Sequence, residues 1–238
     1  MQSIPARCHS SEVSAVIFDA GDILYDAAKW RRWMTEELNR MGIAISFREL
    51  VCEWERELVP VYKGRADYLD AFDSLLEKLI EDTSDRTDFR ARSLEAKDRL
   101  EGEERRAFEG VRAMLLALRS SGLKLGVLSD TESTVDRVRA SLEQLGLAGL
   151  FDSIVTSRDI GRVKPEPEAY RAALEDLGAT ASESLFVAHD QDELDGARDF
   201  GMATVAVETT GPTEGHERIS ATRELFDYLT VHTDSSKH

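Results

Sequence analysis

The sequence has few of the features that assign a chain to a class at first sight. Its 238 residues contain no apolar run of about 18 residues, so a membrane-spanning helix is not expected. No apolar segment of signal-peptide length stands near the first residue, which argues against secretion. The two cysteines, Cys8 and Cys52, form neither a metal-binding pattern nor a disulfide framework. These absences favour a protein of the reducing cytoplasm with no membrane partner.

Positive charge is also scarce. The chain has 30 Lys and Arg residues against 46 Asp and Glu residues, and its formal net charge is −16. Nucleic-acid binding needs a concentrated basic surface, so a nucleic-acid partner is not expected. An anionic substrate would meet a repulsive long-range field, and its site must therefore supply positive charge locally. A divalent cation together with one or two lysines would do so.

Five short apolar runs alternate with stretches rich in helix formers. The runs cover residues 13–18, 123–128, 153–156, 185–188 and 203–207. Such alternation predicts an α/β fold with a parallel sheet wound by right-handed crossovers. Helices are expected over 105–120, 132–145 and 168–177, because a glycine that favours a helix end follows each of them closely.

The stretch between the first two runs is about a hundred residues long, far more than one crossover helix needs. Its apolar residues recur at spacings of three and four, as in Trp30, Trp33 and Met34, and again over 67–80. We expect an inserted bundle of about four helices over 27–99. Because this bundle begins just after the first apolar run, we expect it to lie over the end of that strand and to cover the site as a lid. Its tryptophans could line a substrate pocket, but their spacing favours packing inside the bundle.

Polar side chains stand where four of the strands would end: Asp19, Ser129 with Asp130, Lys164 in a loop, and His189 with Asp190. The carboxyl ends of parallel strands meet at one edge of the sheet, where open α/β sheets place their chemistry. A charge at the end of a buried strand is costly unless it is solvated, paired or functional. These residues are therefore expected to form a catalytic site.

The order of these residues resembles that of the haloacid dehalogenase superfamily over nearly the whole chain. The most specific part is Lys164-Pro165-Glu166-Pro167 followed by Glu168-Ala169-Tyr170, and residues 185–202 resemble the fourth motif and the helix after it. The resemblance implies a three-layer, Rossmann-like parallel-sheet core with an inserted all-helical cap. It places the core at 12–26 and 100–232, the cap at 27–99, and flexible tails at 1–11 and 233–238.

The resemblance also implies a role for each matched residue. Asp19 would be the nucleophile, forming an acyl-phosphate or ester intermediate that water then hydrolyses. Ser129 and Asp130 would bind the transferring group, and Lys164 would keep Asp19 ionised and neutralise charge on that group. Taken singly, a strand-end aspartate can cap a turn, a serine can be an ordinary turn residue, and a loop lysine is usually exposed.

A magnesium ion is the cofactor that the resemblance implies, with Asp19 and the backbone carbonyl of Gly21 as ligands. His189 stands where family members have an acid, and imidazole is a poor magnesium ligand. We therefore expect Asp190 to coordinate instead, with Glu193 as an acceptor behind it. His189 itself could activate the hydrolytic water, or it could hydrogen-bond the neighbouring loop.

A second departure concerns the general acid. Family phosphatases carry an aspartate two residues after the nucleophile, and this chain has Gly21 there. Asp22, the next residue, is best interpreted as a turn residue beside glycine. General acid catalysis contributes about 10²–10⁴-fold, so the reaction type stays open. Arg31 and Arg32, early in the insertion, could meet a substrate anion or could form a solvated helix face.

Three hypotheses follow. The leading one is metal-dependent hydrolysis of a small phosphate ester, a phosphorylated metabolite, through an aspartyl-phosphate intermediate. The second is a 2-haloacid dehalogenase-type hydrolase without metal, which Gly21 and His189 favour because halide leaves without an acid. The third is a catalytically weakened binding module of the same fold.

Overall fold

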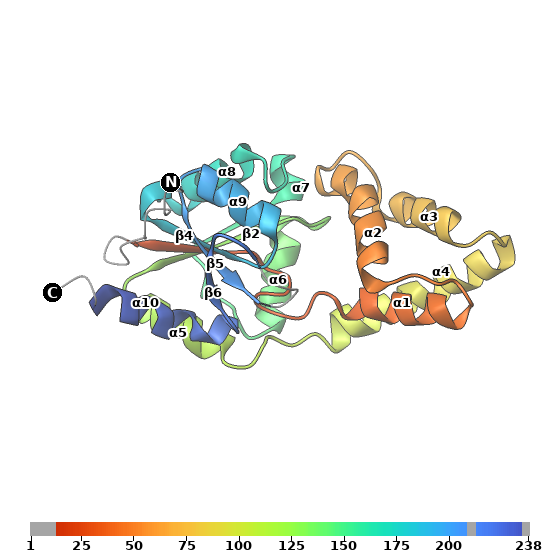
Figure 1. Ribbon diagram of the computed structural model, residues 1–238, viewed down its shortest axis with the longest axis horizontal. Coiled ribbons are helices and arrows are strands. Elements are labelled where there is room, and N and C mark those ends of the chain that lie inside the picture. Colours follow the sequence, from red (N-terminus) through yellow and green to blue (C-terminus); the bar gives the residue numbers. More distant parts are fainter. Residues whose placement is uncertain (1–12, 209–212, 235–238) are drawn as a thin grey trace.

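The computed structural model describes residues 13–208 and 213–234 of the chain. Six parallel strands form one sheet in the order β3-β2-β1-β4-β5-β6 (Figure 1). The strands are β1 (Ala15–Phe18), β2 (Lys124–Ser129), β3 (Ser153–Thr156), β4 (Ser184–Ala188), β5 (Ala203–Val207) and β6 (Glu217–Ile219). The predicted parallel α/β sheet is confirmed, and β1 lies between β2 and β4 near its middle.

Helices cover both faces of this sheet. One face carries α5 (Val111–Ser120), α6 (Val135–Gln144) and α10 (Leu225–Asp234), and the other carries α8 (Pro167–Leu177) and α9 (Gln191–Asp199) with the short α7 (Ser157–Ile160) beside them. Two short 3₁₀ turns, η3 (Ala181–Glu183) and η4 (Thr222–Glu224), complete this part. Strand β1 explains the layering, because its alternate side chains pack into the two opposite clusters, as a buried parallel strand requires.

A helical insertion follows β1. We use this name for α1 (Lys29–Arg40), α2 (Phe47–Tyr62), α3 (Tyr68–Leu79) and α4 (Thr83–Lys97), which lead into the π-helix η2 (Asp98–Glu103). Figure 1 shows it at one end of the sheet. The rings of Trp30, Trp54 and Phe72 pack together with centroids 5.5–6.2 Å apart, so these tryptophans lie inside the bundle as their spacing predicts.

The two connections between the sheet and the helical insertion run side by side. Tyr25 forms backbone bridges with both Gly21 and Ala107, and the Phe108 N–H donates to the Leu24 carbonyl at 2.9 Å. The insertion is therefore attached at the carboxyl edge of the sheet, next to the end of β1.

Several expected boundaries shift. The helix expected over 105–120 begins only at Val111, because Gly110 has a φ of +80°, outside the helical region. The helix expected over 132–145 is α6, and strand β6 was not expected at all. Strand β2 extends to Ser129, which ends the strand rather than following it.

The expected tails at 1–11 and 233–238, Cys8 among them, lie outside the described residues, except that residues 233 and 234 belong to α10. Among the residues that the structure describes, no helix has the length and apolar character needed to cross a membrane.

Candidate active site

Three neighbouring strands bring the first site residues together at their carboxyl ends. Asp19 follows β1, and its N–H donates to the Val187 carbonyl of β4 at 2.9 Å. Ser129 ends β2 on one side of β1, and His189 follows β4 on the other. The Asp19 side chain is only 11 % exposed, so its charge needs a nearby partner.

Lys164 supplies that partner. Its Nζ lies 2.6 Å from Asp19 Oδ1 and 3.1 Å from Glu193 Oε2, and it donates to the Leu128 carbonyl at 3.3 Å. Burial alone would lower the pKa of this lysine, whose side chain is 1 % exposed. The negative charges of Asp19 and Glu193 outweigh burial and hold the Lys164 pKa well above its usual range. The site therefore has a permanent cation beside the predicted nucleophile.

Glu193 and Asp130 complete the surroundings of this lysine. Burial raises the pKa of Glu193 well above its usual range, and Lys164 only partly offsets it. The Asp130 carboxylate accepts the backbone N–H of Lys164 at 3.1 and 3.3 Å, and burial raises its pKa to about 7. Asp130 thus holds the lysine loop, and its predicted contact with substrate stays a prediction.

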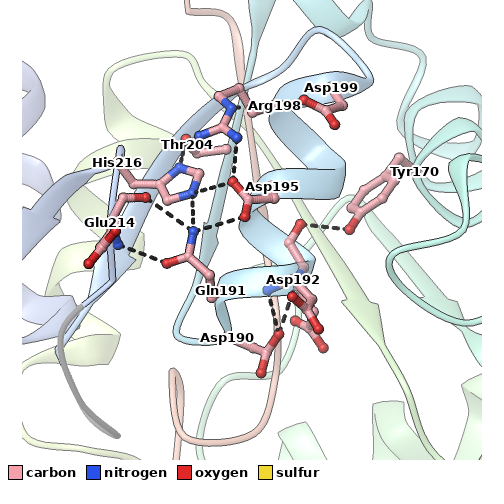
Figure 2. A network of polar contacts seen from close by, with 11 residues as sticks. Tyr170, Asp190, Gln191, Asp192, Asp195, Arg198, Asp199, Thr204, Glu214 and His216 are labelled. Atoms are coloured by element: carbon pink, nitrogen blue, oxygen red, sulfur yellow. Dashed lines mark hydrogen bonds and ion pairs between the residues drawn. The ribbon is translucent and has the colours of Figure 1, made fainter. Parts of the chain in front are cut away.

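His189 and Asp190 lie between β4 and α9. His189 Nε2 is 3.7 Å from Asp19 Oδ2, so the imidazole faces the carboxylate oxygen that Lys164 does not contact. Asp190 caps α9, and its Oδ1 accepts the N–H groups of Asp192 and Glu193 at 2.9 and 3.2 Å (Figure 2). The two residues after β4 therefore have different structural settings, one beside the nucleophile and one at a helix N-terminus.

A polar network anchors the start of α9, as Figure 2 shows. The Gln191 side chain accepts the Glu214 N–H at 2.8 Å and donates to the Glu214 carbonyl at 3.1 Å. The fully buried His216 side chain bonds Thr204 Oγ1 through Nδ1 at 2.7 Å and Asp195 Oδ1 through Nε2 at 3.2 Å. Burial lowers the pKa of His216 below its usual 6.5. These residues carry no motif in the sequence, although they fix the helix that presents Asp190.

The loop after Asp19 leaves little room for the missing acid. A Cβ at Gly21 would lie 3.0 Å from the Ala27 Cβ. Asp22 adopts a φ of +57°, and its Oδ1 accepts the Ala27 N–H at 2.9 Å, as expected of a turn residue. Burial raises the pKa of Asp22, with the His189 charge opposing it. Both residues thus shape the loop that leads into the helical insertion.

A cavity of about 440 Å³ opens above Asp19, between the sheet edge and the helical insertion. Ser129, Lys164 and Asp190 line it from the sheet side, and Trp54, Arg31 and Glu55 line it from the insertion. Arg31 Nη2 lies 3.2 Å from Glu55 Oε1. Arg32 instead forms an ion pair with Asp26, so only the first of the two arginines lines the cavity.

Comparison with known proteins agrees with this geometry. A family model described as "Haloacid dehalogenase-like hydrolase" matches residues 65–207. The chain is 31 % identical to "Phosphatase MT3486" of Mycobacterium tuberculosis, over 84 % of this chain and 90 % of that protein. It is 27 % identical to "(S)-2-haloacid dehalogenase 4A" of Burkholderia cepacia, over 90 % of this chain and 94 % of that protein. The crystal structure of a β-phosphoglucomutase homologue from Thermotoga maritima has the same fold, with a TM-score of 0.66 at 21 % identity, over 92 % of this chain and 99 % of that one.

Proposed function

Because the chain belongs to the haloacid dehalogenase-like hydrolase family, and is a hydrolase, we propose that it hydrolyses small phosphate esters through an aspartyl-phosphate at Asp19. The observation that carries this proposal is the contact of 2.6 Å between Asp19 Oδ1 and Lys164 Nζ at the floor of the cavity. The lysine is an ion-pair partner for the nucleophile and offers a positive charge to an incoming phosphoryl group. The relative named a phosphatase supports the choice of a phosphate ester.

The surrounding residues divide the work of phosphoryl transfer. Asp19 attacks phosphorus while the leaving oxygen departs on the opposite side, so catalysis depends on position and charge. Ser129 lines the cavity beside Asp19 and donates its hydroxyl to a phosphoryl oxygen. Lys164 neutralises charge on the same group, and Glu193 keeps the lysine in place from behind.

The donor set suits Mg²⁺, which binds one or two carboxylates and completes its shell with carbonyls, phosphate and water. Asp19, the Gly21 carbonyl and Asp190 border the same cavity, and we assign these three as its ligands. Asp190 caps α9 through Oδ1, so Oδ2 is the candidate ligand atom. Within residues 13–208 and 213–234, no three His, Cys, Asp or Glu side chains converge as a metal-binding group. The protein thus contributes few ligands, and a bound ion would neutralise charge on the phosphoryl oxygens.

The helical insertion serves as the cap of this enzyme, with the predicted boundaries of 27–99 inside a core of 12–26 and 100–232. Its α2 reaches the lysine loop, where Lys63 forms an ion pair with Glu166, two residues after Lys164. This contact joins the cap to the loop that carries Lys164.

A second candidate is dehalogenation of a small 2-haloacid at the same Asp19. Two observations favour it: Gly21 provides no acid, and His189 Nε2 lies 3.7 Å from Asp19, where it can activate water for ester hydrolysis. The relative named a 2-haloacid dehalogenase covers nearly the whole chain. The third candidate, a binding module, is opposed by the intact contact between Asp19 and Lys164.

The test compares wild type with Asp19→Asn on p-nitrophenyl phosphate, with Mg²⁺ and with a chelator. This substrate needs no general acid because its leaving group is a stable anion. We expect turnover that requires both Asp19 and the metal, while the exposed Asp85→Asn control keeps full activity. Release of chloride from 2-chloropropionate, without release of phosphate from p-nitrophenyl phosphate, would instead support the dehalogenase function. Stabilisation by inorganic phosphate without any turnover would leave only the binding module.

A further inference from the structure

An alkyl phosphate poses a problem that the residues of the sheet edge do not solve. Its leaving alkoxide must receive a proton, and a general acid accelerates such a step by about 10²–10⁴-fold. Gly21 has no side chain, and a Cβ placed there would lie only 3.0 Å from the Ala27 Cβ. Asp22 directs its carboxylate to the Ala27 N–H. The acid must therefore come from elsewhere in the cavity.

Three acids of the sheet edge lie on the side of the nucleophile rather than on the side of the leaving group. Asp130 accepts the Lys164 N–H with both oxygens, and Asp190 caps the first turn of α9. Glu193 lies against Lys164 Nζ at 3.1 Å, behind the nucleophile. In an in-line displacement the leaving oxygen faces away from Asp19, and that side of the cavity is the wall formed by the helical insertion.

One helix of the insertion presents a carboxyl group to that wall. The residues of α2 that border the cavity recur at helical spacing and form one stripe: Val51, Trp54, Glu55, Leu58, Val59 and Tyr62. Glu55 is the charged member of this otherwise apolar and aromatic stripe. Its side chain borders the cavity and is 41 % exposed, so its carboxyl group is open to a molecule bound there. A single glutamate on an apolar stripe is visible in the sequence. Its meaning becomes clear only when the structure shows that this stripe borders the cavity above Asp19.

The surroundings of Glu55 suit a proton donor. Partial burial against the cavity walls raises the pKa of its carboxyl group, the Arg31 charge opposes this, and the net direction is upward. Asp190, Lys164 and Asp19 border the same cavity as Glu55, and their charges influence the pKa of its carboxyl group. Arg31, at 3.2 Å, fixes the orientation of the carboxyl group.

We propose that Glu55 is the general acid and base of this hydrolase, taking from the helical insertion the role for which Gly21 has no side chain. The inference rests on the proposed function. As Asp19 forms its bond to phosphorus and the bond to the ester oxygen breaks, the Glu55 carboxyl group gives its proton to that oxygen and the alcohol departs. The resulting carboxylate then takes a proton from water, whose oxygen attacks the phosphorus of the aspartyl-phosphate. Inorganic phosphate leaves, and both carboxyl groups return to their starting states.

The test uses two substrates that differ in their need for an acid. Propyl phosphate has a poor leaving group, and p-nitrophenyl phosphate has a good one. For Glu55→Gln we expect kcat on propyl phosphate to fall by about 10²–10⁴-fold, while kcat on p-nitrophenyl phosphate stays within a few-fold of wild type. Glu57→Gln is the matched control, because Glu57 lies on the same helix but contacts Lys78 at 2.5 Å outside the cavity.

The other outcomes separate the two proposals. An equal loss on both substrates, or no loss on either, would overturn the role of Glu55 and assign it at most to holding Arg31. Turnover of p-nitrophenyl phosphate shows that the Glu55→Gln variant is folded. If Glu55→Gln does not fold, Glu55→Ala is tested on the same two substrates instead. If wild type and Asp19→Asn hydrolyse both substrates equally, the proposed function itself fails, whatever Glu55 does.

Discussion

Lys164→Met is the substitution whose consequences the structure defines most sharply. Methionine keeps most of the aliphatic stem and removes the ammonium group, which lies 2.6 Å from Asp19 and 3.1 Å from Glu193. Two carboxyl groups, 11 % and 19 % exposed, then lose the cation that they share. Removing one partner of a buried ion pair typically costs about 3–5 kcal/mol of folding free energy. Because both carboxyl groups keep some access to water, we expect about 3 kcal/mol.

The decisive variant is the double substitution. Adding Glu193→Gln to Lys164→Met removes one of the two carboxyl groups left without a cation, so the double variant should be more stable than Lys164→Met by at least about 1 kcal/mol. Glu193→Gln alone should destabilise the protein, because the lysine loses one of its two carboxylate partners. A second substitution that rescues the first is the signature of a charge cluster rather than of lost packing.

The measurement is urea unfolding followed by far-UV circular dichroism, with stability compared through the transition midpoints. Lys78→Met is the control. It breaks the contact between Lys78 and Glu57 on the surface of the insertion, where Lys78 is 51 % exposed, and should cost less than about 1 kcal/mol. The reasoning is refuted if Lys164→Met costs no more than this control, or if Glu193→Gln lowers the stability of Lys164→Met further.

Three further predictions concern other parts of the molecule. His189→Asp places a carboxylate beside Asp19, so the Mg²⁺ concentration for half-maximal hydrolysis should fall at least about tenfold, and an unchanged value would contradict the assigned ligands. Burial holds the pKa of His216 below 6.5, so on acidification the unfolded chain binds a proton at this residue more readily than the folded protein does. Wild type should therefore lose more stability than His216→Gln between about pH 7 and pH 5. Equal losses of stability in the two proteins would argue against this reasoning. Ser46→Ala removes the N-cap of α2, where Ser46 Oγ accepts the Glu49 N–H at 3.2 Å, and should lower the free energy of unfolding by about 1 kcal/mol in the same urea assay; an unchanged midpoint would show that the cap does not contribute.

The sheet could be predicted from sequence because its strands are local patterns. Strand β1 is an unbroken apolar run with a carboxylate directly after it, and the bounds of β3 and β5 agree with the prediction. Strand β6 (Glu217–Ile219) escaped prediction because it has three residues, two of them charged and exposed, and so resembles a loop. The start of α5 was placed too early because Gly110, whose φ of +80° is incompatible with a helix, lies between apparently helical residues.

The residues of the site also fall into those that the sequence predicts and those that it does not. Asp19, Ser129 and His189 meet because parallel strands end at one edge, a rule that needs no knowledge of packing. Lys164 does not end a strand, as the sequence had suggested, but comes from the loop between α7 and α8. Glu55 and Arg31 come from helices whose faces toward the sheet depend on how the insertion is seated over β1. That placement arises from long-range contacts, which a single sequence does not encode as a local pattern.

The distribution of indole rings has a practical consequence. The three tryptophans of the chain, Trp30, Trp33 and Trp54, all belong to the helical insertion, and the first and last of them line the cavity. Intrinsic fluorescence excited at the red edge of the absorption band therefore reports on the insertion alone and is silent for the sheet. A bound molecule or a change in how the insertion is seated would alter the emission of a site-specific reporter that the protein already carries, without any label.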